Sequence, residues 1–278
     1  MSTPFADPLA AHPLAPHPGV WRKPPAIRNP WLRYGLLLAA CGYLVAALAS
    51  LPIDVERVLR GTAYIRDMLV AFVTPDFATR GEAIANGLLE SIAMTIAATV
   101  IGVALSIPIG ICAARNLCGP WLRWPCRALI AVSRAFHELI VAIILVKLLG
   151  FGMLAGVITL CFATIGFFSK LLADAIEACH PAPLEAIRAT GANWFQVVAY
   201  AVLPQVRPRM IGLALYRLDI NFRESAILGV VGAGGIGATL MTAVDRFDFR
   251  IAAAILLIII VLVLVAEFVS GVIRRRLV

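Results

Sequence analysis

The sequence predicts an all-α, polytopic integral membrane protein with six transmembrane helices and a polar cytoplasmic loop between the fourth and fifth. Hydrophobic residues make up 61% of the 278 residues and charged residues 14%, whereas soluble domains are about half apolar and a quarter charged. The run 251–273 carries one charge, Glu267, and as a helix it is about 34 Å long, enough to cross the hydrocarbon core. The net charge of +8 is explained by topology, because Lys and Arg collect on the cytoplasmic side, and no nucleic-acid partner is expected.

Residues 1–33 form a Pro-rich arm that is expected to be cytoplasmic. The arm has no apolar core segment, so it is not expected to be a cleaved signal peptide. His12 and His17 are too isolated to predict a metal site. Basic residues precede the first apolar run and place the amino terminus inside; they are Arg22, Lys23, Arg28 and Arg33.

The first span is expected at 34–51, where Pro52 ends it. Residues 53–80 mix charges of both signs with apolar residues, which is typical of an amphipathic helix along the outer interface. A contact surface for an external partner is an open alternative. We therefore divide the chain into the arm 1–33, a segment 34–80 with the first span and an outer interfacial part, and a transmembrane domain 81–278.

The next spans are expected at 88–113, 128–148 and 153–172. The third contains Arg134, His137 and Glu138, with Arg134 and Glu138 spaced i, i+4 on one helix face. A charge costs about 2.5–3.5 kcal/mol at mid-bilayer, so these side chains should face protein or water. An intrahelical ion pair that fixes packing and a polar translocation path explain them equally well.

A polar segment follows the fourth span. Pro183 suits the first turn of a short helix, and Gly191 is expected to end that helix. Asn193 can cap a second short helix with Gln196 at its N3 position, and Pro204 is expected to close the segment. Two helices joined by a glycine turn are expected to project into the cytoplasm.

The fifth span, 210–231, is the most polar. Its polar residues are Tyr216, Arg217, Asp219, Asn221, Arg223, Glu224 and Ser225. Asp219 can pair with Arg223 at i, i+4. A span that serves packing alone needs no such cluster, so we expect a pathway or gate.

The glycine-rich run 232–237 spells GxGxxG, but it follows a membrane helix and not a strand, so a dinucleotide site is not expected. We expect an outer glycine loop that lets backbones pack tightly. The sixth span, 251–273, ends at the cytoplasmic arginines 274–276. The cysteines contain no CxxC and are expected to be small buried hydrophobes, without metal or cofactor; they are Cys41, Cys112, Cys118, Cys126, Cys161 and Cys179.

The polar segment resembles the EAA signature of permease subunits of bacterial ABC importers. The matching positions have the spacing of that signature, while Ile187 and Ala201 depart from it. The resemblance assigns an ATPase-coupling loop to Glu185, Ala186, Gly191, Ala192, Leu203 and Pro204. The following run LYRLDINFRESAILGVVGAGGIG is similar to phosphonate-type permeases, whose relatives import phosphite and hypophosphite; methionine-type permeases share its glycine-rich part. The resemblance covers about residues 81–278 and implies the methionine-importer permease fold.

The resemblance also implies partners and a location. A homodimer of permeases would lie in the lipid of the bacterial inner membrane, with both termini cytoplasmic. Each of two cytoplasmic ATP-binding subunits would receive one coupling loop, and a periplasmic binding protein would deliver the substrate. The sequence has no GxxxxGK[ST] motif, so the chain itself is expected to bind no nucleotide and to catalyse no reaction.

A phosphonate, phosphite or hypophosphite substrate would favour a cavity with positive charge, which Arg217, Arg223 and Arg134 could supply. The expected translocation path or gate comprises Arg217, Asp219, Asn221, Arg223, Glu224, Ser225, Arg134, His137 and Glu138. Three alternatives stay open: a permease of the same architecture for another solute such as an amino acid, a membrane enzyme or proton-coupled secondary carrier that uses His137 and Glu138, and a structural scaffold. A secondary carrier would transport without an ATPase, and a scaffold would leave the charged fifth span unexplained.

Overall fold

The computed structural model describes residues 29–50 and 55–277, so the predictions for the arm 1–33 fall almost entirely outside the described residues, His12 and His17 included. Regular structure in the described residues is helical throughout. The chain divides into two compact units, Met1–Gly61 and Thr62–Val278.

The helices are α1 (Pro30–Ser50), α2 (Val55–Val73), α3 (Gly81–Ala113), α4 (Pro120–Ala135), α5 (Glu138–Leu149), α6 (Met153–Glu177), α7 (Pro181–Ala189), α8 (Trp194–Val197), the π-helix η1 (Val198–Val202), α9 (Leu203–Val230), α10 (Ile236–Asp245) and α11 (Phe249–Leu277).

In the first unit, α1 is an apolar helix of 21 residues with no buried side chain. Its length and composition suit a helix whose surroundings are lipid. Cys41 lies on this helix and is exposed, so the prediction that it is a buried hydrophobe is wrong. Exposure of apolar residues is the expected state for a helix that faces acyl chains and not a protein core.

Helices long and apolar enough to cross a membrane are α1, α3, α6 and α11, four among the described residues. The pair α4 and α5 counts as a fifth if the two are taken as one bent span. The long helix α9 lies where the fifth span is expected, but its cluster of charged residues keeps it out of this set.

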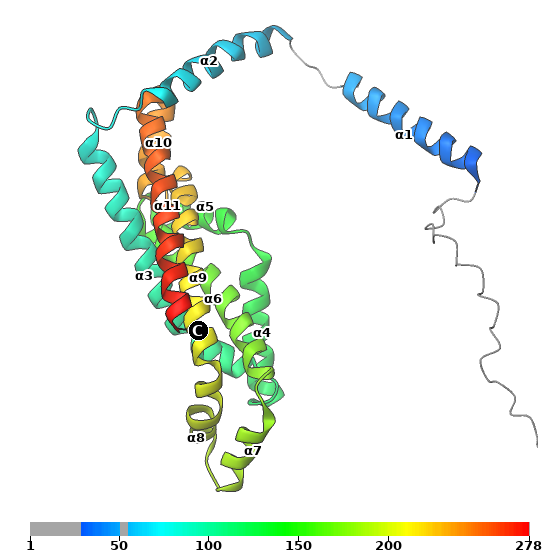
Figure 1. Ribbon diagram of the computed structural model, residues 1–278, viewed down its shortest axis with the longest axis vertical. Helices are drawn as coiled ribbons and strands as arrows, with labels where there is room; N and C mark the ends of the chain where they lie inside the picture. Colours follow the sequence, from blue (N-terminus) through cyan, green and yellow to red (C-terminus); the bar gives the residue numbers. More distant parts are fainter. Residues whose placement is uncertain (1–28, 51–54, 278) are drawn as a thin grey trace, which may run out of the picture. The chain divides into compact units, whose positions relative to one another are not determined.

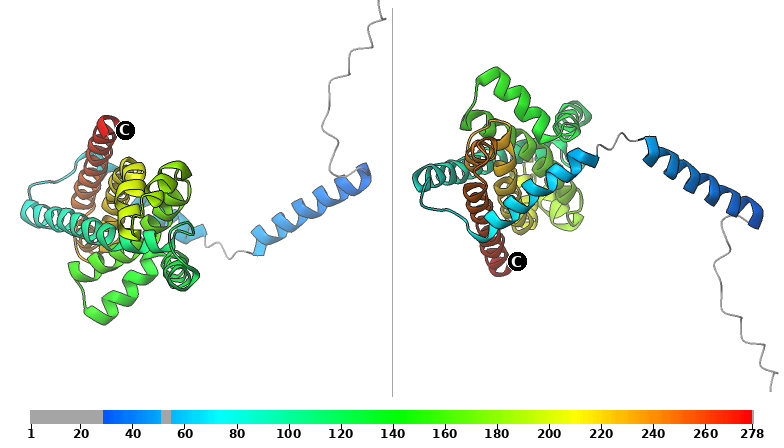
Figure 2. Two further views of the ribbon diagram at one scale, coloured as in Figure 1. Left: turned by 90° about the horizontal axis from the view of Figure 1, so that it is seen from below. Right: turned by 90° about the horizontal axis from the view of Figure 1, so that it is seen from above.

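In the second unit, α3 and α6 pack together along their lengths, and α9 contacts α3, α6, α10 and α11 (Figure 1). The short helices α7 and α8 lie at one end of this bundle, and α10 lies towards the other end (Figure 1). Figure 2 shows the bundle from its two ends. These contacts bury Arg217 of the polar helix α9, whereas Arg223 on the same helix is about half exposed.

The predicted third span, 128–148, is not one helix. Helix α4 ends at Ala135, Phe136 and His137 have extended backbones, and α5 starts at Glu138, bent by 92° from α4. The predicted i, i+4 arrangement of Arg134 and Glu138 on one helix face is therefore wrong. The break instead places the amino terminus of α5 inside the bundle next to α6 and α9.

The prediction that Pro204 closes the polar segment is also wrong. The π-helix η1 runs directly into α9, and Pro204 is the second residue of α9. The second short helix, the π turn and the fifth span thus follow one another without a loop. Helix α7 likewise begins at Pro181, two residues before the predicted start.

The glycine-rich run packs the end of α9 against the start of α10, and α10 itself was not predicted. A Cβ on Gly237 would lie 1.9 Å from the carbonyl oxygen of Ala226. The Ile236 N–H donates to Ser91 Oγ of α3 at 2.9 Å in a buried contact. The expectation of tight backbone packing at this run is confirmed.

Candidate functional site

A cavity of about 540 Å³ lies at the end of the bundle away from α7 and α8, between the last turn of α2 with the segment that follows it and the start of α11 with the turn before it. It contains none of the predicted site residues. The cavity that contains predicted site residues has a volume of about 330 Å³ and lies where the α4–α5 break meets α6 and α9. Its lining residues are Ser133, Arg134, Ala135, Phe136, His137, Glu138, Ala163, Phe167 and Arg217. We call it the central cavity. It brings together Arg134, His137, Glu138 and Arg217, which the sequence placed on two different spans.

Arg217 is the buried cation of the central cavity, with 3% of its side chain exposed. Its Nε donates to Thr164 Oγ1 at 3.0 Å, and its guanidinium carbon lies 5.6 Å from the ring centroid of Phe167. Its Nη2 lies 3.9 Å from Glu138 Oε1, too far for a hydrogen bond, and has no hydrogen-bond partner among the described residues. Two neighbours on α6 therefore hold the guanidinium, while its buried Nη2 is left without a hydrogen bond.

The α4–α5 break orients two more polar side chains. His137 caps α5, because its Nδ1 accepts from the Leu139 N–H at 3.2 Å. That bond assigns the ring proton of a neutral imidazole to Nε2, which becomes a donor. The amino terminus of α5 adds partial positive charge at this point. Glu138, in the first turn of α5, is the acceptor that faces Arg217.

One turn beyond Arg217, hydrogen bonds to two threonine hydroxyls fix α9 to its neighbours α3 and α6. Asn221 is fully buried, and its Nδ2 donates to Thr99 Oγ1 of α3 at 2.8 Å and to Thr164 Oγ1 of α6 at 3.3 Å. Thr164 thus accepts from both Arg217 and Asn221. Sequence reasoning missed Thr164 and gave Thr99 no part in the site, since a threonine in a membrane helix more often satisfies itself on its own backbone.

The other predicted pathway residues are not part of the lining of this cavity. The predicted i, i+4 pair of Asp219 and Arg223 is confirmed at 3.8 Å, with Arg223 about half exposed and not part of the cavity lining. Asp219 instead lines a second cavity between α9 and α11, which also contains Glu267. Glu224 is near enough to interact electrostatically with Glu138, Arg217 and His137. Ser225 Oγ donates to the carbonyl of Phe222 on its own helix.

The predicted coupling segment contains the predicted turn and cap. Gly191 has a φ of +80°, which glycine adopts without strain. Asn193 Oδ1 accepts from the Gln196 N–H at 2.9 Å, and Gln196 Oε1 accepts from the Asn193 N–H at 2.8 Å, so the capping box is confirmed.

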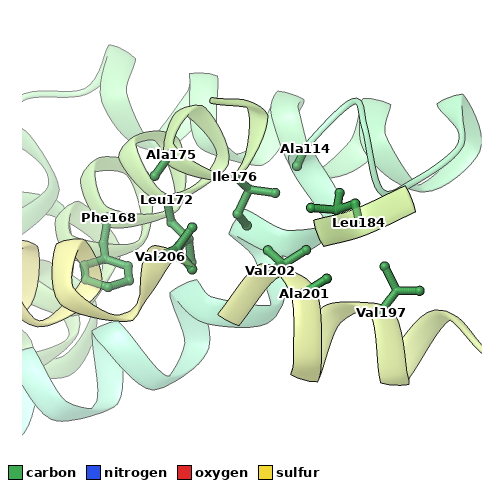
Figure 3. Close-up of a cluster of buried hydrophobic side chains, with 10 residues drawn as sticks. All are labelled: Ala114, Phe168, Leu172, Ala175, Ile176, Leu184, Val197, Ala201, Val202 and Val206. Carbon is green, nitrogen blue, oxygen red and sulfur yellow. The ribbon is translucent and has the colours of Figure 1, made fainter. Parts of the chain in front are cut away.

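The two short helices have an apolar underside and an exposed outer face. The underside belongs to a buried cluster that reaches α6 and the end of α3 (Figure 3); its residues are Ala114, Phe168, Leu172, Ala175, Ile176, Leu184, Val197, Ala201, Val202 and Val206. Of the signature positions, Glu185, Ala186, Gly191, Leu203 and Pro204 are exposed and Ala192 is partly buried. The arrangement presents the signature residues outward on a platform fixed to the bundle.

The turn between α3 and α4, residues 114–119, ties this platform to the bundle. Its carbonyl oxygens accept from the side chains of both short helices: Asn116 from Arg188 Nη2 at 3.4 Å and Leu117 from Trp194 Nε1 at 3.0 Å. Asn116 Nδ2 in turn donates to the Ile176 carbonyl of α6 at 2.8 Å. Neither contact could be derived from spacing, because the partners are more than 70 residues apart.

Glu177 anchors the same turn. Its Oε2 lies 3.0 Å from Arg115 Nε, its Oε1 lies 2.6 Å from Arg127 Nη2, and Oε1 also accepts from the Arg115 N–H at 2.9 Å. One carboxylate therefore joins the end of α6, the α3–α4 turn and α4. Cys118, the last residue but one of this turn, has a raised thiol pKa, chiefly because of burial and to a lesser extent because of the neighbouring Cys112. The thiol therefore stays protonated, which suits a packing role.

Comparison with known proteins gives a consistent result. Residues 106–278 match the family model described as "Binding-protein-dependent transport system inner membrane component". The chain is 42% identical over 253 residues to the phosphate-import permease protein PhnE of Mycolicibacterium smegmatis, which covers 91% of the chain, but it spans only about half, 48%, of that relative. It is 38% identical to the phosphite transport system permease protein PtxC of Stutzerimonas stutzeri, over 87% of the chain and 86% of the relative.

Solved structures show the same fold. An inward-facing form of the MetNI methionine ABC transporter has a TM-score of 0.64 at 22% identity, covering 72% of this chain and 100% of the matched one. An amino acid ABC transporter with histidines has a TM-score of 0.59 at 21% identity, covering 73% and 99%. These identities support the fold and not the cargo.

Proposed function

Because the chain belongs to the family of inner-membrane components of binding-protein-dependent transport systems, we propose that it is the permease subunit of an ATP-driven importer of a phosphorus oxyanion. The relatives with 38% and 42% identity are named for phosphite and phosphate import. The chain's task in such a system is to open a path through the membrane, and the energy comes from ATP hydrolysis in a partner subunit.

The observation that carries the cargo class is the state of Arg217. Arg217 is 3% exposed and held through Nε by Thr164, and its Nη2 has no hydrogen-bond partner in the part of the chain that the structure describes, so an anion in the cavity would supply the missing acceptor. Guanidinium groups bind phosphorus oxyanions with strong, directional hydrogen bonds. Arg134 and the proposed Nε2 donor of His137 line the same cavity.

Six spans follow if α9 and the bent pair α4 and α5 each cross the membrane. Contacts of α9 with α3, α6, α10 and α11 support this, because polar groups inside a helical bundle avoid lipid. In this arrangement both termini, the α3–α4 turn, α7 and α8 are cytoplasmic, and α10 is at the outer side. The arginines of these inner segments support the orientation.

The platform of α7 and α8 is the proposed docking surface for the ATP-binding subunits. Its exposed signature residues, Glu185, Ala186, Gly191, Leu203 and Pro204, and the partly buried Ala192 face outward above a buried underside. Two copies of the permease, two ATP-binding subunits and a periplasmic binding protein complete the proposed assembly. Closure of the ATP-binding subunits would move the two platforms as rigid bodies and switch the access of the central cavity.

Uptake into proteoliposomes that contain the whole complex tests this function. We expect ATP-dependent uptake of labelled phosphite or methylphosphonate and none of methionine, the solute named for more distant relatives at 26% identity. Arg217→Gln should reduce uptake by roughly tenfold or more, because a charge-assisted contact to the anion is lost. Arg209→Gln, a change of an exposed arginine on the same helix, serves as the control.

Uptake of methionine in place of the oxyanions would overturn the cargo class. Transport without ATP would overturn the importer assignment and favour a secondary carrier. Equal uptake by both arginine variants would overturn the role of the central cavity.

A further inference from the structure

In the central cavity a hydrogen-bond acceptor, the Glu138 carboxylate, lies beside a hydrogen-bond donor, the Arg217 guanidinium. This pairing limits the chemistry of the cargo. Arg217 Nη2 and Glu138 Oε1 are 3.9 Å apart, and no hydrogen bond joins them. Arg217 presents donors only, while an ionised Glu138 presents acceptors only. A fixed carboxylate next to the anion-binding guanidinium repels an anion whose nearest atom is a bare oxygen.

By distance alone, a single oxygen could bridge the two atoms; Nη2 itself is buried and would have to turn towards the cavity to meet it. An oxygen about 2.8 Å from both atoms, the usual charge-assisted distance, would have the two contacts at roughly a right angle. A P–O–H oxygen fits this position because it can accept from Arg217 and donate its proton to Glu138. A deprotonated oxygen could satisfy Arg217 but would leave Glu138 facing a negative atom.

The charges that surround the gap favour a singly charged ion. The lining contains two arginines, Arg134 and Arg217, and one carboxylate, Glu138, while His137 is neutral in its assigned form. The lining therefore has one net positive charge.

We propose that Glu138 and Arg217 form an acceptor–donor pair that admits oxyanions carrying an acidic O–H group and disfavours oxyanions without one. This inference rests on the proposed function and names the protonation state of its cargo. Monoprotonated phosphate, phosphite and phosphonate have the O–H group. Sulfate and hypophosphite have none at neutral pH, so the pair separates hypophosphite from the other phosphorus oxyanions.

Equilibrium binding to the permease and ATP-binding subunits in nanodiscs, without the binding protein, tests the pair directly. The probes are ³²P-phosphate and ³⁵S-sulfate at pH 7 and high concentration. We expect the wild-type complex to prefer phosphate over sulfate by roughly tenfold, equivalent to about 1.4 kcal/mol. Glu138→Gln removes the fixed negative charge and adds an N–H donor, so the preference should fall to about threefold or less.

Glu82→Gln is the matched control, because Glu82 is an exposed acid in the first turn of α3. A second measurement needs only the wild-type complex: unlabelled phosphite should displace bound ³²P-phosphate, and hypophosphite should not. Equal binding of sulfate and phosphate, an unchanged preference in Glu138→Gln, displacement by hypophosphite, or no binding of either labelled anion would each overturn the proposal. ATP-driven uptake by the whole complex is measured separately. If uptake continues while any of these four results is found, the acceptor–donor pair is wrong and the proposed importer function still stands.

Discussion

The indole of Trp194 in α8 donates a hydrogen bond of 3.0 Å to the carbonyl oxygen of Leu117 in the α3–α4 turn. A second side-chain bond from the short helices to that turn comes from Arg188. The Trp194 bond gives the short helices α7 and α8 a connection to α3 and α4 that is independent of the direct continuation into α9. Movement of the platform should therefore be transmitted to both parts of the bundle.

Trp194→Phe should lower the number of molecules imported per ATP hydrolysed. The substitution keeps an aromatic ring beside Phe195 but removes the only donor of the side chain, for a loss of about 1 kcal/mol. Parallel assays of uptake and ATP hydrolysis in proteoliposomes measure the ratio. Trp121→Phe, at a side chain that is 94% exposed, should leave the ratio unchanged. An unchanged ratio in Trp194→Phe would show that the α3–α4 turn takes no part in coupling.

Glu177→Gln should destabilise the purified permease by about 1–2 kcal/mol. The estimate is the lower part of the range for charge-assisted hydrogen bonds, because the partners Arg115 and Arg127 are 71% and 45% exposed. Thermal unfolding in detergent checks it. The control is Asp174→Asn, whose exposed i, i+4 pair with Lys170 contributes only about 0.3–0.5 kcal/mol. Equal melting temperatures for the two variants would contradict the prediction.

Gly237→Ala should prevent stable folding or cost about 3 kcal/mol, at the upper end of overpacking, because the added Cβ meets a backbone carbonyl that cannot rotate away. Gly212→Ala, in α9 with open space around it, should instead be neutral or stabilise by about 0.5–1 kcal/mol. The yield of monodisperse protein and the melting temperature report both effects. A well-folded Gly237→Ala variant would refute the close approach of α9 and α10.

Gly191→Asp should leave the permease folded but weaken its association with the ATP-binding subunits. The site is exposed, with nothing near its Cβ, and Asp tolerates the left-handed backbone better than most residues. The new charged side chain would lie on the proposed docking surface. Co-purification of the ATP-binding subunits measures the loss. Gly119→Asp, at the N-cap of α4, is the matched control, since Asp is a favourable cap there.

The helical architecture could be predicted from hydropathy and from the helix-breaking prolines and glycines. The capping box could be predicted from Asn193 and Gln196 alone, because both features depend on local chemistry. The break in the third span was missed, although a local signal was present. His137 followed by Glu138 is a cap and a first-turn acid, which is typical of a helix start. Continuous apolar residues on both sides obscured that signal.

For the central cavity, the sequence predicted some of the lining residues but not their arrangement in space. Arg134 and Arg217 were identified as cavity arginines and meet there, but Arg223, grouped with them, lies outside the cavity lining. Depth along a helix does not give the direction in which a side chain points. The roles of Thr164, Glu177 and Leu117 depend on contacts between distant segments, which spacing does not encode.

The π turn between α8 and α9 has a mechanical consequence. Arg217 is 14 residues beyond Leu203, so it lies about 21 Å along the same helix from the end of the five-residue π turn. A π turn holds extra residues relative to an α-helix. If η1 were rewound by one residue, everything after it would turn by about 100° and advance about 1.5 Å. The Arg217 guanidinium would then lose its contacts with Thr164 and Phe167, so a change of winding in η1 would alter the lining of the central cavity.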